Sequence, residues 1–134
     1  MATITKFEDL EIWQLSRALN KEIFPFLQTL NDSRNYELQK QLDRSAGSIM
    51  DNIAEGFERD GNREFIQFLA ISKASAGEVR SQLYRAFDRN LIEKEKLEKF
   101  QNDCLLIGNK IGKFITYLNN SNIKGKKFNN SNTK

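Results

Sequence analysis

Apolar residues recur at steps of three and four along four long stretches of the chain. The last stretch shows the pattern without a miss, at Leu97, Phe100, Cys104, Ile107, Ile111, Phe114 and Leu118. Such spacing places one apolar stripe along each helix, as in left-handed helix bundles. The pattern predicts helices over about residues 5–30, 34–58, 63–89 and 93–118. Because the connections are short, neighbouring helices should be antiparallel, so the predicted fold is all-α, an antiparallel up-and-down four-helix bundle.

Local signals predict where the first three helices begin and end. Thr5 and Glu8 fit a capping box, in which a hydroxyl and a carboxylate three residues later bond free backbone N–H groups. Pro25 lacks a backbone donor and crowds the preceding turn, so we expect a kink or an early end of the first helix there. Asn62 closes the turn at residues 58–62 and is a candidate cap for the third helix.

The second and third helices are predicted to form a hairpin that turns near Gly61. Facing positions then sum to roughly 121, which puts residues 45–48 opposite residues 73–76. Both stretches hold mostly small side chains, so the two helix axes should approach closely there. The same register brings Arg44 near Glu78 and favours a salt bridge between them.

Several apolar residues lie away from the centres of these stripes. Ile66, Ile71 and Tyr84 do so in the third helix. Met50 and Phe57 lie toward the edge of the stripe of the second helix, and Trp13 lies beside the stripe of the first. One interpretation is a wide core face on each helix. The other is a second apolar surface that a partner subunit covers. Because such residues occur on three helices, we favour a homo-oligomer with Ile66, Ile71 and Tyr84 in its interface.

Charge divides the 134-residue chain into two parts. Lys and Arg total 21 and Asp and Glu total 18, but residues 119–134 hold four of the lysines and no acid. Residues 1–118 therefore carry 17 bases and 18 acids, and we assign them to one nearly neutral bundle. Residues 119–134 are rich in Asn, Ser and Lys without periodicity, and we expect a disordered basic tail.

Composition also excludes several functions. The chain has no His, which removes every mechanism built on an imidazole, and its one Cys allows neither an intrachain disulfide nor a multi-Cys zinc site. No uncharged run approaches the ~18 residues that span a bilayer, so we expect no membrane association. The N-terminus lacks the pattern of a signal peptide, which favours a cytoplasmic location.

The remaining candidates for catalysis are few. Asp51, Asn52, Glu55 and Glu78 are the polar residues to consider, because two carboxylates on facing helices can bind a divalent ion or act as an acid–base pair. Glu78, however, lies about three turns along the hairpin from Glu55. Cys104 occupies a core position and is interpreted as a small hydrophobe, since no general base accompanies it. We therefore expect no enzyme, metal, cofactor or small-molecule substrate.

Five short segments resemble a known family. They are residues 7–14, 41–48, 52–57, 64–69 and 75–78. The run Asn-Ile-Ala-Glu-Gly-Phe at 52–57 is the specific one. These segments resemble the four-helix-bundle family encoded within intervening sequences of bacterial 23S ribosomal RNA genes, and the resemblance extends over roughly residues 7–118. One departure is that the Phe-Pro pair common in the family between the first two helices is absent here.

The resemblance implies an assembly as well as a fold. Members are up-and-down bundles that form ring-shaped homopentamers, and binding to RNA or DNA is the usual proposal for their role. The accessory proteins of diversity-generating retroelements are a related group, but they bind nucleic acid through strongly basic surfaces, which residues 1–118 lack. The resemblance also implies structural or interface roles for the motif residues Trp13, Asn52, Glu55, Gly56, Ser75 and Glu78.

Two classes of function remain. The first is nucleic-acid binding, with RNA as the leading ligand, and its candidates are Arg59, Arg63, Arg80, Arg85, Arg89, Lys124, Lys126 and Lys127. Arg85 and Arg89 are four residues apart and share a helix face that can track phosphates. The alternative for these residues is an ordinary solvated face. The second class is a protein-interaction scaffold with no nucleic-acid role.

Overall fold

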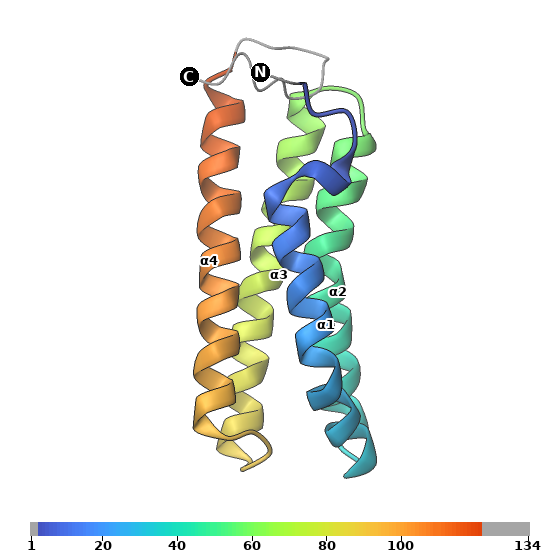
Figure 1. The fold of residues 1–134 in the computed structure, drawn as a ribbon, viewed down its shortest axis with the longest axis vertical. Helices are drawn as coiled ribbons and strands as arrows, with labels where there is room; N and C mark the ends of the chain where they lie inside the picture. Colours follow the sequence, from blue (N-terminus) through green and yellow to red (C-terminus); the bar gives the residue numbers. More distant parts are fainter. Residues whose placement is uncertain (1–2, 122–134) are drawn as a thin grey trace.

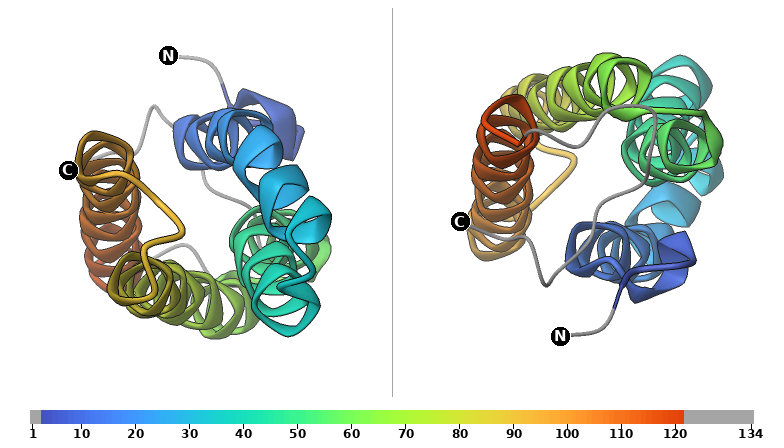
Figure 2. Two further views of the ribbon diagram at one scale, coloured as in Figure 1. Left: turned by 90° about the horizontal axis from the view of Figure 1, so that it is seen from below. Right: turned by 90° about the horizontal axis from the view of Figure 1, so that it is seen from above.

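Four long helices run up and down along one axis in the computed structural model (Figure 1). The model describes residues 3–121. A short 3₁₀ turn and four α-helices make up this part of the chain: η1 (Phe7–Asp9), α1 (Glu11–Asp32), α2 (Tyr36–Glu58), α3 (Asn62–Asp88) and α4 (Lys94–Asn119). The end-on views show the helices in a ring in chain order, with α4 returning beside α1 (Figure 2). The predicted all-α bundle is confirmed.

The core is built from the predicted stripes. Each helix buries the residues that recur at steps of three and four, and Phe65 and Phe100 are the largest fully buried side chains. Phe65 also lies edge-on to Phe57 and to Phe114, with ring centroids 5.8 and 5.6 Å apart. This aromatic cluster joins α2, α3 and α4 at the end of the bundle where the chain turns from α2 into α3.

The first helix differs from its prediction at both ends. It begins at Glu11, after η1, and its N-cap residue Leu10 makes no side-chain cap bond, so the capping box at Thr5 and Glu8 is wrong. Helix α1 also continues through Pro25 to Asp32, so the early end is wrong as well. Proline costs a helix interior about 3 kcal/mol. Burial of the α1 core stripe on both sides of Pro25, which itself lies on the exposed face, offsets that cost.

The start of α3 also differs from its prediction. Gly61, not Asn62, holds the N-cap position, and its φ of 91° lies in the left-handed region that favours glycine. Asn62 is instead the first residue of α3 and is buried. A glycine permits the sharp turn from α2 into α3, which brings the next residue into the bundle.

Hydrogen bonds between α2 and α3 confirm the predicted hairpin register. Ser72 Oγ donates to the Ile49 carbonyl over 2.6 Å, and the hydroxyls of Ser48 and Ser75 lie 2.7 Å apart. The two helices also approach closely at Gly56, where an added Cβ would lie 2.6 Å from the Phe68 Cβ. Close packing therefore extends from the small residues at 45–48 toward the turn.

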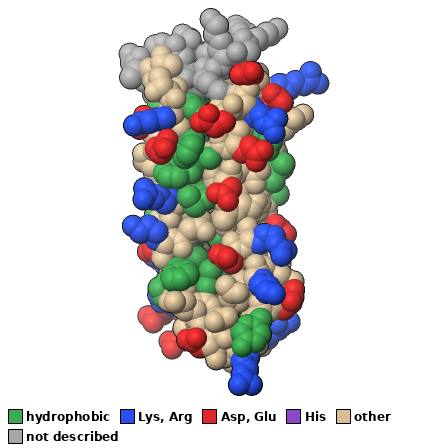
Figure 3. Space-filling view, turned by 90° about the vertical axis from the view of Figure 1, so that its right-hand side faces the viewer, with side chains coloured by type: hydrophobic (Ala, Val, Ile, Leu, Met, Phe, Trp, Pro, Cys, Tyr) green, Lys and Arg blue, Asp and Glu red, His purple; other side chains and the backbone are tan. Residues whose placement is uncertain are grey.

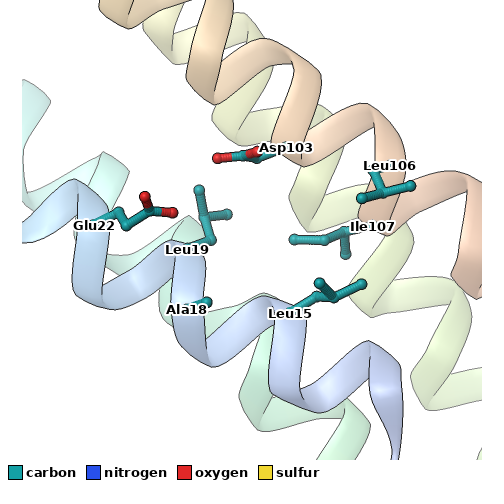
Figure 4. A pocket seen from close by; sticks show the side chains of 7 residues that line it. All are labelled: Leu15, Ala18, Leu19, Glu22, Asp103, Leu106 and Ile107. Carbon is teal, nitrogen blue, oxygen red and sulfur yellow. The ribbon is translucent and has the colours of Figure 1, made fainter.

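The interface between α1 and α4 is the least extensive of the four between neighbouring helices. A small pocket of about 70 Å³ opens there, lined mainly by apolar residues (Figure 4). Glu22 of α1 and Asp103 of α4 lie at one end of it, and Lys99 bridges them, with its Nζ 3.4 and 2.6 Å from their carboxylate oxygens. Lys110 and Glu11 form a further ion pair across the same interface at 3.3 Å.

Candidate binding groove between α2 and α3

A polar groove runs along the outer side of the α2–α3 hairpin. It has a volume of about 410 Å³ and is lined by Gln41, Arg44, Ser45, Ser48, Glu78, Gln82 and Arg85. The α2 residues recur at steps of three and four, as do those of α3, so each set forms one helix edge. We call this site the α2–α3 groove. It joins two of the segments that carry the family resemblance, because its α2 residues fall within 41–48 and Glu78 within 75–78.

Side chains across the α2–α3 groove are held by hydrogen bonds to neutral partners. Arg85 Nη1 donates to Gln41 Oε1 over 2.7 Å. Ser48 bonds to Ser75 and also accepts from Asn52 Nδ2, over 2.8 Å. These contacts give Asn52 and Ser75 of the family motif a structural role, because both fix the Ser48 hydroxyl between the helices.

The charged groups of the α2–α3 groove are not paired with one another. Within residues 3–121, neither Arg44 nor Arg85 forms a salt bridge, and the predicted ion pair of Arg44 with Glu78 is absent although both line the groove. Gln82 Oε1 is buried without a hydrogen-bond partner in the same part of the chain. Two guanidinium groups and one carboxylate leave this groove with a net positive charge.

The arginines predicted to bind nucleic acid fall into different environments. The positive charge of Arg59 is compensated, because its guanidinium lies 3.3 Å from Glu55 and 3.9 Å from Glu64. The same group lies over the Phe68 ring, 5.0 Å from its centroid. Glu55 thus serves as an exposed ion-pair partner. Arg63 lies beyond the turn, in the first turn of α3, and is exposed.

Arg80 and Arg85 lie on opposite edges of α3. Arg80 Nε donates to Gln101 Oε1 of α4 over 2.9 Å, and Gln101 Nε2 donates back to the Arg80 carbonyl. Arg85 instead lines the groove beside α2. Arg89 is the exposed C-cap residue of α3, about 40 Å from Arg63 at the other end of the helix. The arginines therefore form no single phosphate-tracking stripe.

Charges of both signs are mixed over the face drawn in Figure 3, and neither forms a continuous patch there. This mixture agrees with the near balance of bases and acids in residues 1–118. The basic tail is the part of the chain with an excess of one sign, and Lys124, Lys126 and Lys127 lie outside the described residues.

The apolar residues predicted for an oligomer interface also lie in different environments. Ile71 and Tyr84 are each about half exposed, whereas Ile66 packs partly against the core. Ile71 lies one turn before Ser75, on the edge of α3 that faces α2, whereas Tyr84 lines a groove of about 460 Å³ between α3 and α4. Leu105 of α4, which sequence analysis missed, lies in that second groove and is 41% exposed.

Two further motif residues make contacts within the bundle. Trp13 is half-buried, with its ring 5.1 Å from that of Phe7 and 5.7 Å from the Arg17 guanidinium. Its contact with Phe7 packs η1 against the start of α1. Gly56 is buried where α2 meets Phe65 and Phe68.

Two features typical of catalytic sites, a cluster of metal ligands and a reactive thiol, can be assessed within residues 3–121. No group of three or more Cys, Asp or Glu residues there could hold a metal ion. Cys104 is buried, and burial raises the pKa of its thiol to about 12, so it stays protonated at neutral pH and is a poor nucleophile. None of the described helices is long and apolar enough to cross a membrane.

Fold and surface together define a four-helix-bundle protein with a polar groove along one hairpin. The chain belongs to the family of 23S rRNA-intervening sequence proteins, whose family model matches residues 8–113. A similar solved structure is that of a protein with unknown function from the S23 ribosomal protein family of Bacteroides thetaiotaomicron VPI-5482. That protein is 26% identical, the match covers 78% of this chain and 97% of the other, and the TM-score is 0.74.

Other comparisons add little about activity. Among curated proteins no relative matches the sequence. Neither the family description nor that of the solved structure names an enzymatic activity. The relation to accessory proteins of diversity-generating retroelements stays a prediction.

Proposed function

We propose that this protein is a non-catalytic, self-assembling four-helix bundle that binds RNA as a homopentameric ring. The observation that carries RNA binding is the way α3 holds its arginines. Arg80 and Arg85 are oriented by glutamine oxygens, not by carboxylates. A neutral acceptor positions a guanidinium without compensating its charge, so both groups keep their full attraction for phosphate.

Exposed apolar side chains support self-assembly. Tyr84 and Leu105 lie in one groove between α3 and α4, and both are more than 40% exposed. An apolar surface of this kind gains free energy when a second subunit covers it. The number of subunits, five, rests on the family resemblance alone.

Fluorescence anisotropy with a labelled single-stranded RNA at low salt tests the RNA proposal. We expect binding that weakens as salt rises, because cations that contact phosphates release counterions. The variant Arg63→Gln/Arg80→Gln/Arg89→Gln should bind RNA at least ~10-fold more weakly. The slope of its log binding constant against log salt concentration should be shallower by about two. Replacing Lys124, Lys126 and Lys127 by Gln tests the tail in the same assay.

The matched control for these variants is Lys21→Gln/Lys40→Gln/Lys113→Gln, which removes three exposed lysines from other helices. We expect a much smaller loss of affinity in this control. Equal losses in the control and the arginine variant would show a general charge effect. Absence of RNA binding by the wild type at low salt would contradict the proposal outright.

Light scattering on a sizing column tests the assembly. A pentamer of 15.6 kDa chains has a mass of about 78 kDa. We expect this mass for the wild type and a smaller one for Tyr84→Ser/Leu105→Ser. A monomeric wild type would contradict the ring and would leave Tyr84 and Leu105 as solvent-exposed side chains.

The second candidate is a protein-interaction scaffold, which the balanced charge of residues 1–118 favours. Nucleic-acid-binding surfaces normally carry a clear excess of bases. A pentamer whose mass and anisotropy do not respond to RNA would select this alternative.

A further inference from the structure

The α2–α3 groove presents two kinds of unused hydrogen-bonding capacity. The guanidinium groups of Arg44 and Arg85 supply donors and positive charge, and no carboxylate of the described residues pairs with either. Glu78 and Gln82 supply acceptors, and the buried Gln82 Oε1 has no donor within the same part of the chain. A ligand that matches this groove therefore carries an anionic group together with hydrogen-bond donors.

The cationic side fits a phosphate better than a single-point anion. A guanidinium has five N–H donors in a planar fork, and Arg85 donates one of them to Gln41 Oε1. That bond fixes the plane of the Arg85 group before a ligand arrives. The remaining donors of Arg85 and those of Arg44 can bond several phosphate oxygens at once.

The acceptor side excludes a bare inorganic anion as the best ligand. A carboxylate at Glu78 repels an anion, and a buried amide oxygen that lacks a donor is unfavourable, so both call for O–H or N–H groups on the ligand. Ribose hydroxyls supply such groups next to a phosphate. No aromatic side chain within residues 3–121 lines the groove, so this part of the chain offers no platform for base stacking, and recognition should tolerate any base.

We propose that the α2–α3 groove binds one ribonucleoside phosphate, with its phosphate at Arg44 and Arg85 and its ribose hydroxyls at Glu78 and Gln82. A volume of about 410 Å³ lies in the range of small-molecule sites, ~300–1,000 Å³. The bound group is either a free nucleotide or one nucleotide of an RNA strand. Only the second case rests on the proposed function.

Calorimetric titration of the full chain with uridine 5′-monophosphate tests the site. We expect saturable binding, at least 10-fold weaker binding of inorganic phosphate, and several-fold weaker binding of the 2′-deoxy nucleotide. Arg44→Gln should weaken uridine monophosphate binding at least 10-fold, whereas the matched control Arg17→Gln, which replaces an exposed arginine of α1 outside the groove, should leave it unchanged. Glu78→Ala, which removes one of the two proposed acceptors, should reduce the preference for ribose over deoxyribose.

Circular dichroism melting of each variant shows that loss of binding is not loss of folding, since Arg44 and Glu78 are both exposed. Equal affinities for phosphate and nucleotide, or equal effects of Arg44→Gln and Arg17→Gln, would overturn the site. The same holds if the wild type fails to bind uridine monophosphate.

A short RNA distinguishes the two sources of the ligand. If RNA displaces uridine monophosphate and Arg44→Gln weakens RNA binding in proportion, the groove takes a nucleotide of the strand. If uridine monophosphate binds and RNA does not displace it, the groove takes the free nucleotide. RNA binding that depends on Arg63, Arg80 and Arg89 but not on Arg44 would overturn the groove as an RNA site and leave the proposed function intact.

Discussion

The α2–α3 and α1–α4 interfaces close the same bundle by different means. Buried or part-buried hydroxyls cross the first, with Ser72 bonded to the Ile49 carbonyl and Ser48 to Ser75. The second borders a small, mainly apolar pocket (Figure 4). Among the described residues, the bonds that cross it are ion pairs of Lys99 and Lys110, whose side chains are 52% and 36% exposed.

This difference predicts that the α2–α3 interface is more rigid than the α1–α4 interface. A hydrogen bond shielded from water fixes the register of two helices, because leaving either group unpaired costs about 1–3 kcal/mol. An exposed ion pair contributes only about 0–1 kcal/mol. The α2–α3 hairpin is thus the rigid support on which the proposed binding groove is built, and we expect the bundle to open first between α1 and α4.

The largest effect should come from Gly56→Ala, at a close contact between α2 and α3. The new Cβ would lie 2.6 Å from the Phe68 Cβ, an atom next to the backbone that cannot move alone. We expect the free energy of unfolding to fall by about 3 kcal/mol, the upper part of the usual range for overpacking. Urea denaturation measures it.

Gly108→Ala is the matched control, since a Cβ at Gly108 would meet nothing within 4 Å. Alanine favours a helix interior over glycine by about 0.5–1 kcal/mol, so this variant should be slightly more stable than the wild type. A Gly56→Ala protein as stable as the control would contradict the close contact.

Ser45→Leu should have the next largest effect. Ser45 is 5% exposed, and a leucine there must push α2 and α3 apart. We expect a loss of about 1–3 kcal/mol in the free energy of unfolding. Ser81→Leu, at an exposed serine of α3, should stay within about 0.5 kcal/mol of the wild type. Unchanged thermal stability of Ser45→Leu would count against the hairpin register.

Thiol labelling can compare the two interfaces directly. Cys104 lies in the core on α4, and its raised pKa of about 12 keeps the buried thiol protonated, so labelling at neutral pH reports opening of the structure. A Cys104→Ala/Ala76→Cys protein carries the thiol on α3 instead. We expect Cys104 to label through an opening at least about 1 kcal/mol less costly than that of the α3 thiol. Equal labelling would show that the bundle opens as one unit.

Lys99→Gln should have the smallest effect. Its hydrogen bond to Asp103, with the charges of Asp103 and Glu22, raises the pKa of Lys99 above its usual 10.5. This contribution to stability is therefore fully present below pH 10.5 and is lost as the pH rises through the folded-state pKa. Because the side chain is about half exposed, we expect a loss under about 1 kcal/mol at neutral pH, smaller still in high salt.

Lys21→Gln, which removes an exposed lysine from α1, is the control for Lys99→Gln. Urea denaturation at pH 7 in low and high salt measures both variants. A loss at Lys99 that exceeds 1 kcal/mol or resists salt would show that the α1–α4 interface is stronger than its exposed ion pairs suggest.

The periodic pattern of the sequence determined the helices, their core stripes and the α2–α3 register. These features follow from local spacing, because a residue at a step of three or four lies on the same helix face whatever the rest of the chain does. The helix ends were less predictable. At Pro25 the local cost of a proline inside a helix is offset by burial of the α1 core stripe on both sides of it. That burial depends on the whole bundle.

The candidate site was decided by tertiary structure. Sequence spacing placed Arg80 and Arg85 on one helix but could not say that a glutamine of α4 holds the first and a glutamine of α2 the second. Nor could it show that Arg59 is compensated by Glu55 and Glu64. The physical reason is that periodicity fixes the direction of a side chain on its own helix, whereas its partners depend on the rotation and approach of neighbouring helices, which packing of the entire core sets.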